Sequence, residues 1–571
     1  MKTIWAEKLP SEQPLSFYPR PQLVRDSFLC LNGSWDFSMD ENSRPVAYTQ
    51  TIPVPFCPEC ELSGIQKSSR RGKFLHYRRF FTLPDGFQKD RVLLHFDAVD
   101  LHASVFLNGI PLGTHRGGYW PFCFDITDKL RPSHNELAVT VTDDGAAACM
   151  DARGKQSAKP GGILYPQHSG IWQSVWLESV PETYIAELKI TPDYDAAELR
   201  LQIKTNASCA CAVELDGVAF ATASGTVVHI PLPGFHPWSP EDPFLYYFTV
   251  KAGEDTVRSY FAMRKFTAER QPDGTPRLCL NGQPYFCIGV LDQGYWSDGL
   301  VTPPSEEAMV CDIQTMKALG FNTLRKHAKV EPLRWYYLCD TMGMLVWQDI
   351  VNGGGPGSFL IEKVPVLFPF RCRDNRYRLF GRENKKSRKL YYTELVNTVS
   401  LLYNTPSVVL WTAFNEGWGQ FDAVTAAAKL KALDPSRLVD HASGWFDQGG
   451  GDVLSRHIYF RPPVFYRQKP DKRPLCLTEF GGYALCENKE KKIFGYRRFK
   501  TARDLTNALC RLWSVYLMRA RKKGLSAAIY TQLSDVEQEE NGLLSYDRRR
   551  LKILPEPLQE VNERLKQEPQ P

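Results

Sequence analysis

The chain has 571 residues, of which 43% are hydrophobic and 23% are charged, and this length predicts two to four domains instead of one hydrophobic core. Its net charge of +6, from 70 basic and 64 acidic residues, is too small for a dedicated nucleic-acid binder. No eighteen apolar residues run together, and Met1–Pro21 lacks the apolar core of a signal peptide, so we expect no membrane partner and a cytoplasmic location.

The first part of the chain, residues 1–182, has the pattern of β-strands. Short alternating runs such as Arg91–Phe96 and Ala103–Leu107 are separated by turn residues, as in antiparallel sheets. The segment opens with LNGSWDF at residue 31 and closes with SGIWQSVWLE at residue 169. We therefore expect an all-β sandwich over this part.

A shorter β segment follows at residues 183–267. Its expected strands are Glu198–Ile203, Cys211–Leu215 and Tyr246–Val250. The size suits an immunoglobulin-like sandwich, although the cysteine and tryptophan hallmarks of antibody domains are missing. This segment is expected to be a second, independent β-sandwich.

From residue 268 to 571 the pattern changes, because strands begin to alternate with helical stretches such as Ser305–Leu319 and Ala423–Ala432. This alternation indicates a parallel sheet. Eight strands in about 300 residues predict a (β/α)₈ barrel. The eight expected strands are Tyr285–Val290, Asn322–Arg325, Met344–Trp347, Val408–Phe414, Leu438–His441, Leu454–Tyr459, Leu475–Glu479 and Ala527–Gln532.

Two glutamates end apolar runs in this barrel. Glu416 follows the run Val408–Trp411, and Glu479 follows Leu475–Leu477; both are succeeded by glycines that let the backbone turn sharply. At the ends of strands four and seven they would face one another across the barrel mouth, where catalytic residues collect. Paired carboxylates act as acid and nucleophile on glycosidic bonds.

The connection after the third expected strand, Val351–Ser387, is unusually long and begins with a glycine-rich run. Loops of this length are usually functional or disordered, and on the upper face of a barrel this one would be a candidate lid.

Fifteen cysteines are present, many of them inside apolar runs such as Leu278-Cys279-Leu280, so we interpret them as small buried hydrophobic residues in a reducing compartment. Cys57-Pro58-Glu59-Cys60 has the C-x-x-C spacing. A zinc site would need a second such pair. We therefore expect no metal and no cofactor.

Taken together, these motifs resemble glycoside hydrolase family 2, the group of β-galactosidases, β-glucuronidases and β-mannosidases. The resemblance covers nearly the whole chain and implies a jelly-roll domain, an immunoglobulin-like domain and a catalytic TIM barrel, in that order. It implies that Glu416 is the acid/base and Glu479 the nucleophile of a retaining enzyme. One proton shared between them lets Glu416 start as an acid while Glu479 stays charged.

The resemblance also implies supporting residues around the two glutamates. Asn415 would bind the 2-hydroxyl of the sugar, Arg325 would support the nucleophile, and Tyr459 would hydrogen-bond it. Asp349 resembles an acid of the family's third strand. The remaining expected substrate contacts are His327, His457 and Trp347. Either histidine could instead be a hydrogen-bonded core residue.

Three departures leave the sugar open. Where glucuronidases carry an Asn-x-Lys that binds the substrate carboxylate, this chain has Glu540-Asn541-Gly542-Leu543. The aspartate that galactosidases place before the closing motif of the first domain is absent from Tyr165–His168, and the expected eighth strand lacks a tryptophan. The nominal prediction is an exo-acting β-galactosidase. Alternatives are a hydrolase for terminal arabinose, mannose or glucuronate and a non-catalytic carbohydrate-binding protein; a homo-oligomer stays open.

Overall fold

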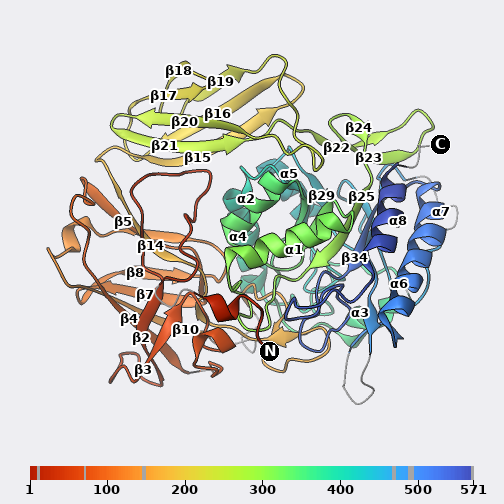
Figure 1. Ribbon diagram of the computed structural model, residues 1–571, viewed down its shortest axis with the longest axis horizontal. Helices are drawn as coiled ribbons and strands as arrows, with labels where there is room; N and C mark the ends of the chain where they lie inside the picture. Colours follow the sequence, from red (N-terminus) through yellow and green to blue (C-terminus); the bar gives the residue numbers. More distant parts are fainter. Residues whose placement is uncertain are drawn as a thin grey trace.

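A computed structural model describes residues 1–9, 13–69, 72–143, 150–368, 370–465, 471–486 and 494–567. Two β-sandwiches precede a parallel eight-stranded barrel. In Figure 1 the first sandwich (red and orange) lies beside the barrel (green to blue), and the second (yellow-green) lies above both. The expected multidomain architecture is confirmed. We keep 1–182, 183–267 and 268–571 as proposed domain limits.

The first sandwich consists of a six-stranded and a four-stranded antiparallel sheet. Alternate residues of Asn135–Thr142 are buried, because successive side chains of a strand point to opposite faces. The core between the sheets includes Trp35, Phe37 and Tyr77. The strands are β3 (Gln50–Val54), β2 (Gly33–Asp40), β4 (Phe74–Phe81), β10 (Asn135–Thr142), β7 (His102–Leu107) and β8 (Ile110–Arg116) in one sheet, and β1 (Leu29–Cys30), β14 (Val175–Val180), β5 (Arg91–Phe96) and β9 (Phe122–Asp125) in the other.

The second sandwich packs a three-stranded sheet on a four-stranded one around Leu201, Val213 and Val250. A small sheet of β22 (Phe266–Arg270), β23 (Pro276–Leu280) and β24 (Gln283–Pro284) then leads into the barrel. The strands of the sandwich are β15 (Ile185–Asp193), β16 (Glu198–Thr205) and β19 (Val227–Pro231), and β18 (Val218–Ala223), β17 (Ala210–Leu215), β20 (Tyr246–Ala252) and β21 (Asp255–Phe261).

All eight expected barrel strands are present in one parallel sheet. Nearly every residue of these strands is buried, as expected for strands covered on both faces. In order around the sheet they are β29 (Leu438–Asp440), β28 (Val408–Thr412), β27 (Leu345–Asp349), β26 (Thr323–Lys326), β25 (Cys287–Asp292), β34 (Leu525–Thr531), β31 (Leu475–Gly481) and β30 (Leu454–Ile458). The helices are α1 (Glu306–Ala318), α2 (Leu333–Met342), α3 (Phe359–Glu362), α4 (Lys385–Leu402), α5 (Ala423–Leu433), α6 (Ala502–Arg511), α7 (Met518–Arg521) and α8 (Pro555–Gln567).

The barrel departs from the regular pattern on one side. Residues 441–453, all of them described, connect β29 to β30 without a helix. The two strands are the ends of the sheet order and do not pair, so the barrel is nearly closed. The expected alternation is wrong there, because a turn-rich segment with three consecutive glycines at 449–451 cannot sustain a helix.

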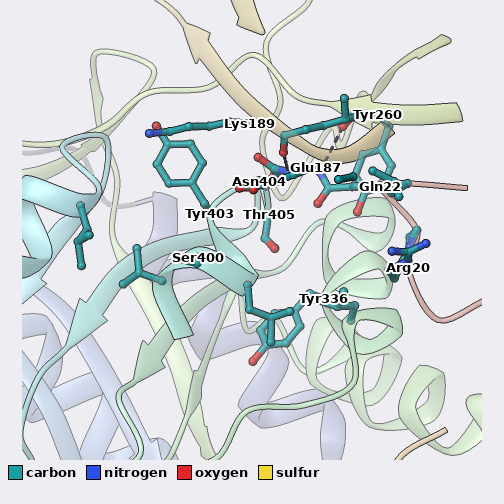
Figure 2. Close-up of a pocket in the computed structure, with 18 residues that line it drawn as sticks. Arg20, Gln22, Glu187, Lys189, Tyr260, Tyr336, Ser400, Tyr403, Asn404 and Thr405 are labelled. Atoms are coloured by element: carbon teal, nitrogen blue, oxygen red, sulfur yellow. Dashed lines mark hydrogen bonds between the residues drawn. The ribbon is translucent and has the colours of Figure 1, made fainter. Parts of the chain in front are cut away.

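A polar junction ties the three domains together away from the barrel mouth (Figure 2). Gln22 donates from Nε2 to the carbonyl oxygens of Tyr260, at 3.2 Å, and Asn404, at 2.9 Å. The Asn404 side chain in turn accepts from the Ile190 amide at 2.8 Å and donates to the Leu188 carbonyl at 2.7 Å. The N-terminal segment, the second sandwich and the end of α4 therefore meet around a cavity of about 270 Å³.

The described cysteines are all free thiols. Cys57 and Cys60 are buried with Phe56 and Leu300 in a small apolar cluster, which gives the C-x-x-C pair a packing role. In the described part of the chain, the helices are all too short or too polar to cross a bilayer.

Candidate active site

A cavity of about 790 Å³ lies at the carboxyl ends of the barrel strands. Its walls come from residues just beyond β27 and β28, from the loop that follows β27 and from residues 153–164 of the first domain. Phe460, Phe494 and Tyr496 complete the wall. The volume is in the range of pockets that enclose a small ligand.

Glu416 lies four residues beyond β28 and projects into this cavity. Its backbone φ of 51° and that of Gly417, 76°, are in the left-handed region, so the chain turns sharply after the strand. The Glu416 amide donates to the Ser443 carbonyl at 2.9 Å, which anchors the turn. The side chain is 12% exposed, so the carboxylate remains open to a ligand.

Glu479 lies within β31 and is almost fully buried. Its Oε1 accepts from Arg325 Nη1 at 3.0 Å, and its Oε2 accepts from the Tyr459 hydroxyl. Burial raises the pKa of Glu479, but the charges of His457 and Arg325 and the Tyr459 hydrogen bond outweigh it, so this pKa lies below its usual value. Glu479 is therefore an ionised carboxylate at neutral pH.

Arg325, on β26, connects four groups of the site while fully buried. Besides Glu479, its guanidinium donates to both oxygens of Asp349 at 3.1 Å and to Asn415 Oδ1 at 2.9 Å. It also donates to the Thr478 carbonyl at 3.2 Å. These contacts offset the cost of burying the guanidinium group, and they fix the directions of the side chains that it contacts.

His457, at the end of β30, lies between the two glutamates. Its Nδ1 is 2.8 Å from Glu416 Oε1 and its Nε2 is 3.7 Å from Glu479 Oε1. One donor atom from each of the three residues lies within 4.8 Å of the others, which makes this trio the candidate metal-ligand set in the described chain. Both Glu479 oxygens already accept hydrogen bonds from Arg325 and Tyr459, and the Arg325 cation beside them disfavours a metal ion at this position.

His327 is a second buried histidine near Glu479. Its Nδ1 is 3.0 Å from Gln293 Oε1, and its Nε2 is 3.7 Å from Asp349 Oδ2 and 4.0 Å from Glu479 Oε1. Burial lowers the pKa of His327 far below its usual value, and the charges of Lys155 and Arg325 lower it further. His327 is therefore neutral and can donate or accept a hydrogen bond at the cavity wall.

The structure brings eight of the nine expected site residues together and leaves one aside. Trp347 is fully buried in the barrel core with Leu345 and Leu410. On β27 it lies two residues before Asp349 and therefore one layer deeper on the same face of the strand. Trp347 supports the floor of the site and does not line the cavity.

Sequence reasoning missed two parts of the wall. Tyr496 stacks on Tyr459 with ring centroids 4.0 Å apart, and the aromatic pair Phe494-Gly495-Tyr496 was its only local signal. Residues 153–164 carry no motif of any kind, because their contact with the cavity depends on how the first domain docks on the barrel. Lys155 is the residue of that segment whose charge helps to lower the pKa of both Glu479 and His327.

Family models match two parts of the chain: the description "Glycosyl hydrolases family 2, TIM barrel domain" fits residues 278–473, and "Glycosyl hydrolase 2 galactose-binding domain-like" fits residues 48–169. A β-galactosidase large subunit from Leuconostoc lactis is 27% identical over 71% of this chain and 64% of its own length. A β-galactosidase from Thermoanaerobacter pseudethanolicus is 26% identical over 56% of this chain and 44% of its own. The chain thus spans less than two thirds of these curated relatives.

Solved structures share the fold over almost the entire chain. A β-glucuronidase from an uncultured Clostridium species superposes with a TM-score of 0.73 at 17% identity, covering 97% of this chain and all of its own. A β-galacturonidase from Eisenbergiella tayi, solved with galacturonate, has a TM-score of 0.71 at 20% identity, covering 96% and 99% of the two chains. At these identities the likeness concerns the fold.

Proposed function

The chain belongs to glycoside hydrolase family 2, and from this premise we propose that it is a glycosidase, namely a retaining exo-β-glycosidase that works by double displacement. The observation that carries the proposal is the meeting of Glu416 and Glu479 across the barrel mouth, with an oxygen of each within 4.8 Å of the other. Retaining enzymes need carboxyl groups about 5 to 5.5 Å apart, and inverting enzymes about 6.5 to 9.5 Å. The short separation supports retention.

The contacts support different roles for the two glutamates. Glu479 is ionised and oriented by Arg325 and Tyr459, as a nucleophile must be. Glu416 has a single side-chain partner, His457, among the described residues, which leaves one oxygen free for the leaving group. The barrel-domain match ends at residue 473, so the role of Glu479 rests on these contacts.

In the proposed mechanism, Glu479 attacks the anomeric carbon while Glu416 gives its proton to the departing glycosidic oxygen, forming a covalent glycosyl-enzyme. Glu416 then removes a proton from water, which attacks the same carbon and releases Glu479. Asn415 accepts from Arg325 at 2.9 Å through Oδ1, which turns its NH₂ group away from Arg325, and in the proposal this group donates to the 2-hydroxyl of the sugar.

Two terminal sugars are candidates. The relatives from Leuconostoc lactis and Thermoanaerobacter pseudethanolicus are named β-galactosidases, which favours galactose. The structures with the same fold are named β-glucuronidase and β-galacturonidase, so a hexuronic acid is the second candidate to be tested. The first-domain segment 153–164 and the loop after β27 wall the cavity, and a walled pocket fits the end of a glycan chain better than its middle.

The test is to follow the hydrolysis of 4-nitrophenyl β-glycosides by proton NMR. The β-anomer of the free sugar should form first and then mutarotate, because two inversions restore the starting configuration. An α-anomer as the first product would overturn the proposed mechanism. Full activity of the Glu479→Ala variant would overturn the proposed site.

A further inference from the structure

Lys155 brings a positive charge from the first domain into the cavity of the barrel. It lies in the segment 153–164 that lines the cavity, and it is only 7% exposed. The charge is close enough to the reacting groups to lower the pKa of Glu479. Removing an ammonium group from water is costly, so a buried lysine at the wall of the cavity suggests a function that compensates this cost.

The segment that carries Lys155 is docked on the barrel at three places. The amides of Arg153 and Gly154 both donate to the Asn352 carbonyl at 3.0 Å. Gly154 adopts a φ of 60°, and a Cβ there would come within 2.3 Å of the Ala328 carbonyl oxygen, so only glycine permits this approach. The Tyr165 hydroxyl donates to Glu539 Oε2 at 2.6 Å. Lys155 is therefore held on a rigid support.

The Lys155 ammonium has only weak contacts with the described part of the protein, one of them with the Tyr165 ring, whose centroid is 5.5 Å away. In the described chain its Nζ makes no hydrogen bond, and its ion-pair partner is Glu539 Oε2 at 3.9 Å. Glu539 is itself occupied, because Oε2 accepts from Tyr165 and Oε1 accepts from Asn541 at 3.3 Å. An ammonium group has three N–H donors, so Lys155 can donate up to three hydrogen bonds to a ligand in the cavity.

We propose that Lys155 binds the carboxylate of a terminal β-linked hexuronic acid and selects it over the neutral hexose. The inference rests on the proposed glycosidase function and names its substrate class. A sugar attacked by Glu479 at its anomeric carbon has its C5 substituent directed away from that carbon, toward another wall of the pocket. An ammonium–carboxylate hydrogen bond is roughly twice as strong as one to a neutral hydroxyl.

The experiment compares substrates that differ only at C6. Wild-type enzyme, Lys155→Met and Lys317→Met are assayed on the 4-nitrophenyl β-galacturonide and β-galactoside, and on the β-glucuronide and β-glucoside. Lys317 is the control lysine, because its ammonium, unlike that of Lys155, donates to protein atoms, the carbonyls of Pro240 and Gly343, and it lies outside the cavity.

Wild type should prefer the uronide within at least one pair. Lys155→Met should reduce kcat/KM for that uronide by about tenfold or more relative to its neutral partner, chiefly through KM, as expected for a lost charged hydrogen bond. Lys317→Met should leave the ratio unchanged, and Lys155→Arg should restore part of it. A wild-type preference for the neutral hexoside, or an equal loss on both substrates in Lys155→Met, would overturn the inference.

The assays distinguish a failure of the proposed glycosidase function from a failure of the proposed role of Lys155. Hydrolysis of galactoside or glucoside without any uronide activity would leave the glycosidase function standing and remove the role of Lys155. Inactivity of wild type on every β-glycoside would remove the proposed function itself. If Lys155→Met does not fold, competitive inhibition of wild type decides: in at least one of the pairs galacturonate–galactose and glucuronate–glucose, the free uronate should inhibit more strongly than the hexose, and stronger inhibition by the hexose in both pairs would overturn the inference.

Discussion

The imidazole of His457 holds Glu416 through one ring nitrogen, with Nδ1 2.8 Å from Glu416 Oε1. Its other nitrogen lies 3.1 Å from the Ser443 hydroxyl, which in turn donates to Thr478 Oγ1 at 2.9 Å. Gly444 passes directly beneath the ring, where a Cβ would come within 2.6 Å of it. The ring is therefore fixed, and the proposed acid/base has a fixed neighbour.

Replacing His457 by glutamine should change the pH profile as well as the rate. The charge of His457 helps to hold the pKa of Glu479 below its usual value. Without that charge this pKa rises, so the acidic limb of the kcat/KM profile should move to higher pH. At neutral pH, kcat/KM should fall by about 10- to 100-fold, because Glu416 loses its fixed position. Initial rates from pH 4 to 8 give both results.

His441→Gln is the matched control for this variant. His441 is also buried at this end of the barrel, but its Nε2 faces Asp447 Oδ1 at 3.1 Å and neither catalytic glutamate. It should leave the acidic limb in place even if it lowers stability. An unmoved limb in His457→Gln would contradict the electrostatic role of that residue.

Separate alanine variants of the two glutamates should lose activity in different ways. Glu416→Ala should slow substrates with poor leaving groups by about 10²- to 10⁴-fold, the usual worth of general acid catalysis. It should spare the first step for leaving groups that need no proton. Glu479→Ala should slow every substrate, because no glycosyl-enzyme can form without the nucleophile. Steady-state kinetics on aryl glycosides of graded leaving-group pKa measure the difference.

The products formed with added azide give a second test of the roles of Glu416 and Glu479. In Glu416→Ala azide should attack the glycosyl-enzyme from the face normally used by water and give the β-glycosyl azide. In Glu479→Ala it should attack the substrate from the opposite face and give the α-azide. Equal losses on all substrates without azide products would mean that another pair of residues performs the chemistry.

A buried aspartate outside the site should control the pH dependence of stability. Burial raises the pKa of Asp340 to about 6, in spite of hydrogen bonds from Ser407 and Tyr260. Because this pKa is above the unfolded value of about 3.9, Asp340 stabilises the fold at low pH, and the contribution is lost as pH rises from about 4 to about 6. Relative to Asp340→Asn, wild type should lose up to about 3 kcal/mol over that range.

Thermal denaturation midpoints of wild type and Asp340→Asn at pH 4, 5, 6 and 7 test this expectation. Asparagine keeps the shape of the side chain, so it can still accept from the Ser407 amide, which is 2.7 Å from Oδ1. A constant difference between the two proteins across the range would show that Asp340 is charged in the folded state at every pH.

The loop after β27 should influence the choice of aglycone. Leu367 lines the cavity and is 58% exposed, so a bulky apolar aglycone can cover it. Leu367→Ser should raise KM for such substrates about fivefold, since burying part of a leucine is worth about 1 kcal/mol. Leu360→Ser is the control, because Leu360 is exposed on the same loop but does not line the cavity. Equal effects of the two variants would assign the loop a merely structural role.

Local sequence determined much of this protein. Continuous apolar runs such as Val408–Trp411 identify some of the barrel strands, because a strand covered on both faces is mostly apolar along its length, and the alternation with helical stretches indicates the others. The positions of Glu416 and Glu479 at the ends of two such runs then follow from parallel topology alone. The alternation of side chains along a strand also places Trp347 and Asp349 on one face of β27. It does not show how far below the barrel mouth each side chain lies. The sequence therefore could not assign Trp347 to the floor and Asp349 to the wall.

Tertiary structure alone decided the rest. Lys155 lies 324 positions before Glu479 in the chain, in a segment without periodicity or motif, and it reaches the cavity because Gly154 lets the first domain approach the Ala328 carbonyl. The position of His457 between the two glutamates likewise depends on the barrel, because closure of the sheet brings the carboxyl ends of β28, β30 and β31 together at one mouth. Such contacts form only when separate elements pack together. The residues that determine this packing are distributed over whole surfaces, so no local sequence pattern predicts the contacts.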